Sequence, residues 1–174
     1  QGNLNNDIGV PLTLLGLDAS HDVAVVELGM NHPGEIVSLA AMTQPTVALV
    51  NNAQREHLEF MSTVEAVALE NGSVIASLPT SGTAVFPADD AFSGLWRKLA
   101  GERACRTFAV APFVRTTVKP DVSCEMPVWI DGAWQINAVT PSGDLHYSLH
   151  VAGLHNVKNS LAAITCAWSA GAPL

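Results

Sequence analysis

VAVVELGMNHPGEI at residues 23–36 and VALVNNAQREHLEF at residues 47–60 decide the fold that we predict for this chain. Each begins with β-branched and apolar residues without polar alternation, the pattern of a strand buried on both faces of a parallel sheet. Each run then stops at polar side chains able to hold a metal, which are Glu27 in the first and His57 and Glu59 in the second. Ligands bind beyond the carboxyl ends of the strands in such sheets, so we expect the functional site here.

Helical patterns separate these apolar runs from two further ones. Prolines fall near the first turns of two expected helices, where a missing N–H is tolerated, and apolar positions between residues 64 and 75 form a helical stripe. We expect helices over residues 8–17, 33–42, from Ser62 or Thr63 to 78 and from Asp89 or Asp90 to 99, and strands over residues 23–28, 46–50, 83–86 and 105–110. Strands that alternate with helices through short connections predict an α/β fold with a mostly parallel, doubly wound sheet flanked by helices.

The pattern changes after residue 110. Residues 122–130, 134–139 and 145–151 alternate apolar and polar positions and are joined by hairpin-type turns at Asp131-Gly132 and at residues 141–144. We therefore expect an antiparallel β subregion over residues 111–151, followed by a helix over residues 156–170.

Composition limits the classes of protein to which this chain can belong. Its 174 residues are 48% hydrophobic and 14% charged, enough for one sizeable core and too apolar for disorder. The net charge of -8, without a cluster of Lys and Arg, argues against a nucleic-acid partner. No apolar run is long enough for a membrane-spanning helix.

Cysteine usage and the two ends of the chain indicate where the protein works and how complete it is. The cysteines are distant from one another and form no CxxC pair, as expected of free thiols in a reducing cytoplasm; they are Cys105, Cys124 and Cys166. The first residue is not Met, and both ends are rich in turn-forming residues. We therefore expect residues 1–174 to be one domain truncated at both ends.

Four segments, in order and at matching spacings, resemble the central ATP-binding domain of the Mur ligases. They are GNLNNDIGVPLTLL at residues 2–15, ELGMNHPGEI at 27–36, ALVNNAQREHLE at 48–59 and GLHNVKNSLAA at 153–163. The resemblance implies a P-loop NTPase-like fold. It also implies an ATP- and Mg²⁺-dependent ligase that adds D-alanyl-D-alanine to UDP-N-acetylmuramoyl-tripeptide through an acyl phosphate. Such an enzyme serves peptidoglycan precursor synthesis in the bacterial cytoplasm, and we expect a monomer that needs neither nucleic acid nor membrane.

The same resemblance assigns roles to individual residues. It implies that Glu27 and His57 are catalytic residues of the metal site. Glu59, two residues after His57, would face the same side if the segment is extended and would then support the site from behind its ligands; the alternative is a surface acid. It places Asn156 and Asn159 on the adenine ring, with His155 beside the nucleotide. The candidates close to the UDP-muramoyl substrate, Asn3, Asn5, Asn6 and Asn31, lie in two polar segments.

Residue type alone leaves other interpretations open for these positions. Glu27 could cap the next helix, and His57 could be a structural or surface histidine, because Mg²⁺ prefers oxygen ligands. Asn156 and Asn31 could each cap a helix, and a run of asparagines is typical of any turn. We expect Lys158, between the two adenine candidates, to be solvated.

Two departures from the Mur ligase pattern bear on function. The phosphate-binding GxxGKT loop is not in this sequence; in the family it precedes the position at which this chain begins, so we expect the isolated chain to be inactive. Asn71 stands where many relatives have a carbamylated lysine that helps to bridge metals, so either Glu70 or a neighbour compensates or the metal site is altered. The alternatives are a non-catalytic nucleotide-binding module, or another Mur or folylpolyglutamate-type ligase.

Overall fold

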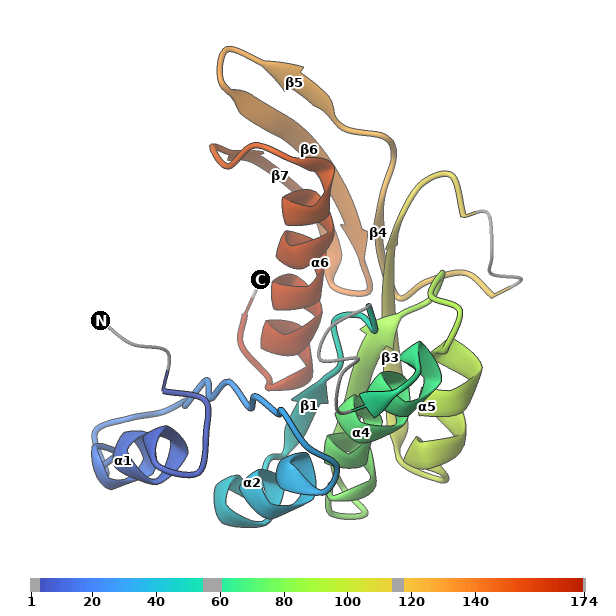
Figure 1. Cartoon of the computed structure of the whole chain (residues 1–174). Coiled ribbons are helices and arrows are strands. Elements are labelled where there is room, and N and C mark those ends of the chain that lie inside the picture. Colours follow the sequence, from blue (N-terminus) through green and yellow to red (C-terminus); the bar gives the residue numbers. More distant parts are fainter. Residues whose placement is uncertain (1–3, 55–60, 114–117, 174) are drawn as a thin grey trace.

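The computed structural model describes residues 4–54, 61–113 and 118–173, and it is built around a seven-stranded sheet (Figure 1). The first four strands, which are β1 (Val47–Leu49), β2 (Thr83–Pro87), β3 (Ala104–Val110) and β4 (Val122–Cys124), pair in parallel in sequence order. Their carboxyl ends therefore meet at one edge of the sheet, where the sequence places its polar residues. This half of the sheet confirms the predicted parallel α/β architecture.

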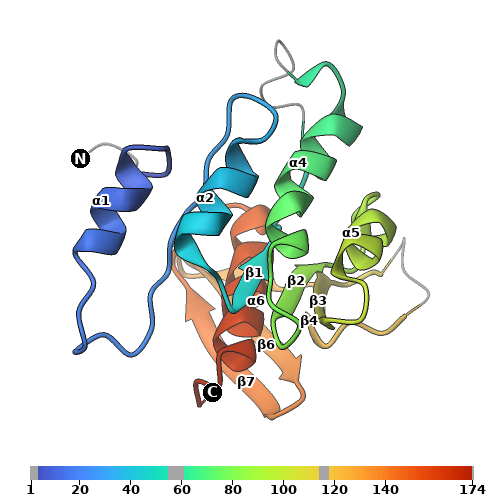
Figure 2. The same ribbon diagram turned by 90° about the horizontal axis from the view of Figure 1, so that it is seen from below.

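Helices cover both faces of the parallel strands (Figures 1 and 2). On one face, α2 (Glu35–Thr43), α4 (Val64–Ala76) and α5 (Ser93–Ala100) enclose an apolar cluster that includes Ala84, Phe86 and Trp96. On the other face, α6 (Leu154–Ser169) packs on a second cluster with Val85, Phe108 and Leu161. Neighbouring residues of β2 thus point into different cores, which explains why this strand has no polar alternation.

The antiparallel part continues the same sheet. β6 (Ala133–Thr140) pairs along one edge with β4 and β5 (Val128–Ile130) and along the other with β7 (Gly143–Leu149). The turn between β5 and β6 uses Asp131 at φ 50° and Gly132 at φ 79°, the positive values that a tight hairpin turn requires. The predicted run 122–130 is therefore two short strands, and the predicted hairpins are confirmed.

Local hydrogen bonds explain where two of the helices begin. Thr63 is the N-cap of α4 and its hydroxyl accepts from the N–H of Ala66 at 3.1 Å. At α2 the N-cap is Gly34, with φ 91°, so the prediction that the helix starts at Pro33 is wrong by two residues. The buried carboxylate of Glu70, on α4, accepts from the N–H of Ile36 at 3.0 Å and satisfies this helix terminus from a neighbouring element.

The prediction of a strand over residues 23–28 is wrong. These residues have no regular secondary structure and pair with no strand among the described residues, and Val23 and Val25 are 60% and 93% exposed. The segment connects α1 (Gly9–Leu15) to α2 along one side of the molecule (Figure 2). An apolar run of this length is the same in sequence whether or not a neighbouring strand hydrogen-bonds to it. The sequence pattern therefore cannot tell a paired strand from an unpaired segment. No helix in the described part of the chain is long and apolar enough to cross a membrane.

Candidate functional site

Glu27 lies against the N-terminal asparagine segment. The side chain of Asn5 donates from Nδ2 to Oε1 of Glu27 at 2.9 Å, and the N–H of Gly29 donates to the carbonyl of Asn5 at 2.7 Å. A Cβ at Gly29 would lie 2.5 Å from Nδ2 of Asn5, so only glycine allows this close approach. The structure therefore brings together a predicted metal ligand and a predicted substrate residue.

Asn6 has a structural role in the same segment. Its Oδ1 accepts from the N–H of Gly9 at 2.8 Å and from the N–H of Ile8 at 3.2 Å, in the manner of an Asx turn that starts α1. The open alternative, that the asparagine run forms a turn, holds for Asn6. Asn5 instead directs its side chain to Glu27.

Asn31 does not cap α2. Its N–H and that of His32 donate to Oε2 of Glu35 at 2.6 and 3.1 Å, so the carboxylate of Glu35 organises the turn before the helix. These two hydrogen bonds, that of Asn31 first, hold the pKa of Glu35 below its usual value. The side chain of Asn31 is exposed, as a substrate residue would be.

At the start of α6, three asparagine side chains form a connected series of hydrogen bonds. Nδ2 of Asn51 donates to Oδ1 of Asn159 at 2.7 Å, across 108 residues of sequence. Nδ2 of Asn159 lies 3.4 Å from Oδ1 of Asn156, and Nδ2 of Asn156 donates to the carbonyl of Ala152 at 2.7 Å. We call this series, Asn51, Asn159, Asn156 and the Ala152 carbonyl, the asparagine relay. It joins the segment just after β1 to the first two turns of α6.

The contacts of α6 decide two expectations drawn from the sequence. The N-cap of α6 is Gly153, and Asn156 lies inside the helix, where its Nδ2 donates to the carbonyl of Ala152, so the capping role for Asn156 is wrong. Lys158 is not simply solvated either. Its Nζ lies 2.7 Å from Oδ1 of Asp89, which follows β2, and both side chains are partly buried. Two contacts thus hold α6 to the carboxyl ends of two neighbouring strands.

His155 projects from the same turn and is exposed. Its ring packs against the backbone of Gly153, where a Cβ would lie 2.5 Å from Cε1 of the imidazole, and Gly153 has φ 95°. Both the backbone conformation and the close contact therefore require glycine at this position. The exposed imidazole is next to the two asparagines predicted to contact adenine.

Asn71, on α4, contacts the loop that follows β1. Its Nδ2 lies 3.5 Å from the carbonyl of Asn52, immediately after Asn51. Glu70, the proposed substitute for the family lysine, is instead engaged in capping α2. This hydrogen bond gives Glu70 a structural role, and Asn71 contacts the loop that follows β1.

The predicted metal site is only partly within the described structure. His57, Glu59 and Asn3 lie outside the described residues. Within residues 4–54, 61–113 and 118–173, no group of three or more His, Cys, Asp or Glu side chains is arranged to hold a metal ion. Glu27 is exposed and offers the carboxylate oxygen chemistry that Mg²⁺ prefers.

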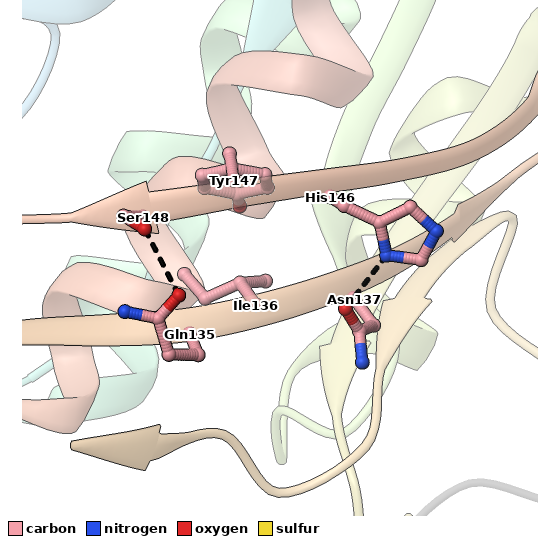
Figure 3. Close-up of a pocket in the computed structure, with 6 residues that line it drawn as sticks. All are labelled: Gln135, Ile136, Asn137, His146, Tyr147 and Ser148. Carbon is pink, nitrogen blue, oxygen red and sulfur yellow. Dashed lines mark hydrogen bonds between the residues drawn. The ribbon is translucent and has the colours of Figure 1, made fainter. Parts of the chain in front are cut away.

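A shallow pocket of about 190 Å³ lies elsewhere, on the β6–β7 hairpin (Figure 3). Its polar walls are formed by cross-strand pairs. Oγ of Ser148 donates to Oε1 of Gln135 at 2.9 Å, and Nδ1 of His146 lies 2.7 Å from Oδ1 of Asn137. None of the residues predicted from the sequence lines this pocket, so we do not place the functional site here.

Sequence reasoning missed Asn51, Gly29 and Asp89. Asn51 and Asp89 each lie two positions past the end of an apolar strand, so the rule that ligands bind beyond strand ends could have selected both. Gly29 follows Glu27 by two residues, but nothing local indicates that a side chain from residue 5 packs on its Cα.

The family model of the Mur ligase middle domain matches residues 1–167. The chain belongs to the Mur ligase family. It is 38% identical to the UDP-N-acetylmuramoyl-tripeptide--D-alanyl-D-alanine ligase of Escherichia coli over 177 aligned residues, which cover 99% of this chain and 37% of that protein. The resemblance inferred from four sequence segments is thereby confirmed.

Solved structures of the Mur ligase family share this fold. MurF from Acinetobacter baumannii superimposes with a TM-score of 0.90 at 32% identity, covering 100% of this chain and 37% of that one. MurF from Thermotoga maritima, in complex with ADP, superimposes with a TM-score of 0.82 at 20% identity, covering 100% of this chain and 39% of that one, and supports the fold alone. The chain therefore spans between a third and two-fifths of the length of these relatives.

Proposed function

We propose that this chain acts as the middle, nucleotide-binding domain of an ATP-dependent ligase that adds D-alanyl-D-alanine to UDP-N-acetylmuramoyl-tripeptide. The main support is the 38% identity over 99% of the chain to the Escherichia coli ligase of that specificity. The chemistry of the side chains supports it, because Glu27 offers carboxylate oxygens of the kind that Mg²⁺ binds and the asparagine relay offers amide groups that can pair with a nucleobase. The reaction, substrates and cytoplasmic setting belong to this proposal, as do domains before and after residues 1–174.

In this proposal Glu27 helps to hold Mg²⁺. A carboxylate oxygen has more than one lone pair, so Glu27 can accept from Asn5 and bind a hard cation together. When bound, the ion would neutralise phosphate charge during transfer of the terminal phosphoryl group to the tripeptide carboxylate. Asn5 restricts the carboxylate to one orientation, which lowers the entropy lost when the site fills. His57 remains the proposed partner of Glu27.

Asn156 and Asn159 are proposed to read the edge of adenine, with His155 beside the nucleotide and Asn31 and the Asn3–Asn5 segment near the UDP-muramoyl substrate. A carboxamide offers a donor and an acceptor side by side, which matches the acceptor N7 and donor amine of adenine. A non-catalytic nucleotide-binding module would retain these contacts without turnover.

The decisive test is Glu27→Ala in the full-length protein. We expect turnover to fall by about two orders of magnitude or more, because a metal ligand is lost at the reacting phosphate. The melting temperature should change little, since Glu27 is exposed and its removal leaves no buried cavity. Coupled ADP release with both substrates measures turnover, and thermal denaturation measures stability. Full turnover by the variant would reject the metal role of Glu27, and an inactive wild-type protein that still binds ATP would favour the binding module.

A further inference from the structure

We propose that Asn51 is a positioning residue that fixes how the Asn159 carboxamide is presented, and thereby contributes to selection of adenine over other nucleobases. The inference rests on the proposed adenine contact of Asn159. It assigns a role to a residue at the end of β1 that is separated from α6 by more than one hundred positions in sequence. The link between them is the 2.7 Å hydrogen bond from Nδ2 of Asn51 to Oδ1 of Asn159.

The direction of the relay is set at its far end. The backbone carbonyl of Ala152 can only accept, so Asn156 must turn its Nδ2 towards it, at 2.7 Å. The Oδ1 of Asn156 then faces Asn159, which must present Nδ2 in return, at 3.4 Å. Oδ1 of Asn159 is consequently left for a donor, and Asn51 supplies that donor. Each carboxamide has one orientation consistent with all three contacts.

Stability alone does not favour this arrangement. The Oδ1 atom of Asn51 is buried, and no donor among the described residues reaches it. A buried acceptor without a partner is unfavourable, and such exceptions to complete pairing are typical of functional sites. Asn159 itself is on an exposed part of α6, where a side chain held only by its own helix would sample several rotamers. The bond from Asn51 removes that freedom.

An amide held in one orientation discriminates between bases better than one that rotates. Adenine presents the acceptor N7 beside a donor amine, whereas guanine presents the acceptor O6 in place of that amine. A carboxamide that cannot exchange its N–H and C=O groups therefore matches adenine and opposes guanine. Asn51 would act on selectivity through Asn159, without needing to contact the base.

The test compares Asn51→Asp, Asn51→Ala, Asn159→Ala and the double variant Asn51→Ala/Asn159→Ala in the full-length ligase. Aspartate keeps the shape of asparagine, but as a carboxylate it cannot donate to Oδ1 of Asn159. Asn137→Asp is the matched control, because it makes the same chemical change on the exposed hairpin, where Asn137 pairs with His146. The measurements are kcat and KM with ATP and with GTP, together with the melting temperature of each variant.

We expect Asn51→Asp to raise the KM for ATP roughly tenfold, the change in equilibrium equivalent to one hydrogen bond. The preference for ATP over GTP should shrink, while kcat at saturating ATP stays within about threefold of the parent. If Asn51 acts only through Asn159, the double variant should behave as Asn159→Ala alone. Asn51→Ala gives the same comparison without a new charge, should the aspartate variant fail to fold.

The experiment distinguishes failure of the positioning role of Asn51 from failure of the adenine contact of Asn159. If Asn159→Ala raises the KM for ATP but the Asn51 variants leave it within about twofold of the parent, Asn51 does not position Asn159. The same conclusion follows if the effects of the two alanine variants multiply in the double variant, because independent contributions do so. If Asn159→Ala itself changes neither the KM for ATP nor the ATP preference, the adenine contact is wrong and the positioning role falls with it.

Discussion

At the scale of single residues, Gly29 determines how Asn5 packs, because the side chain of Asn5 lies against its Cα. A Cβ there would be 2.5 Å from Nδ2 of Asn5, which donates to Glu27. We predict that Gly29→Ala in the full-length protein displaces Asn5, releases the Glu27 carboxylate and raises the Mg²⁺ concentration needed for half-maximal turnover about tenfold. Titration of activity with MgCl₂ measures this.

The control for that prediction is Gly94→Ala. Gly94 lies in α5, and a Cβ there would meet nothing within 4 Å. Because alanine favours the helix over glycine, this variant should be as stable as the parent or more so, with an unchanged Mg²⁺ requirement. An unchanged requirement in Gly29→Ala as well would mean that Asn5 does not orient Glu27.

Burial makes the reactivity of two cysteine thiols depend strongly on pH. Burial raises the pKa of Cys166 to about 11, and burial together with the charge of Glu125 raises the pKa of Cys124 to about 11. At pH 8 about one thiol in a thousand would be ionised at each, so we predict slow alkylation by iodoacetamide that accelerates towards pH 11 and on unfolding. Mass spectrometry of the labelled protein measures the rates.

The raised pKa values of Cys124 and Cys166 also make the stability of the fold depend on pH. Because folding raises these two pKa values above those of the unfolded chain, the contribution to stability is complete below about pH 9 and is lost as the pH rises through about 11. Labelling of the native protein at pH 8 as fast as that of the denatured chain would contradict the burial of both thiols.

At the scale of elements, the start of α2 depends on a side chain from α4. Glu70 is 8% exposed and accepts from the N–H of Ile36 at 3.0 Å. We predict that Glu70→Ala lowers the free energy of unfolding by about 1–3 kcal/mol, because it leaves a buried N–H without an acceptor. Glu70→Gln keeps an oxygen acceptor at the same position and should lose less. Urea denaturation compares them, and equal losses would show that the hydrogen bond is not the cause.

At the scale of the whole molecule, the two cores share the parallel strands, and α6 covers one of them. Leu161 of α6, the helix that carries Asn156 and Asn159, is fully buried in the cluster that contains Phe108. We predict that Leu161→Ala costs about 2–5 kcal/mol of stability through the cavity it leaves. It should also weaken nucleotide binding, because the helix that carries the relay is less firmly held.

The exposed neighbour Ala163 provides the comparison for Leu161 on the same helix. Ala163→Ser should change stability by no more than about 0.5 kcal/mol and leave nucleotide binding intact. Thermal denaturation together with calorimetric titration of ATP and Mg²⁺ into the full-length variants measures both effects. Normal ATP affinity in Leu161→Ala would indicate that the packing of α6 and the nucleotide site are independent.

The sequence by itself determined the parallel α/β architecture, the two hairpins and the family. These depend on local periodicity, turn chemistry and short motifs, which are all properties of neighbouring residues. The sequence also proposed Glu27 as a metal ligand, Asn5 as a substrate residue, and Asn156 and Asn159 as adenine contacts. It could not decide whether residues 23–28 join a ladder, because extended apolar backbone looks the same in sequence with or without a partner strand.

Only the tertiary structure decided which distant side chains meet. Asn51 and Asn159 are 108 residues apart, and Lys158 and Asp89 are 69 apart, yet each pair lies at 2.7 Å. Such contacts depend on strand order and on where α6 crosses the sheet, and no local pattern records either. For the same reason only the structure shows that Glu70, which the sequence suggested as a substitute metal ligand, accepts a hydrogen bond from the first turn of α2. The residue type determines which groups a side chain can donate or accept, but the fold determines which partner it contacts.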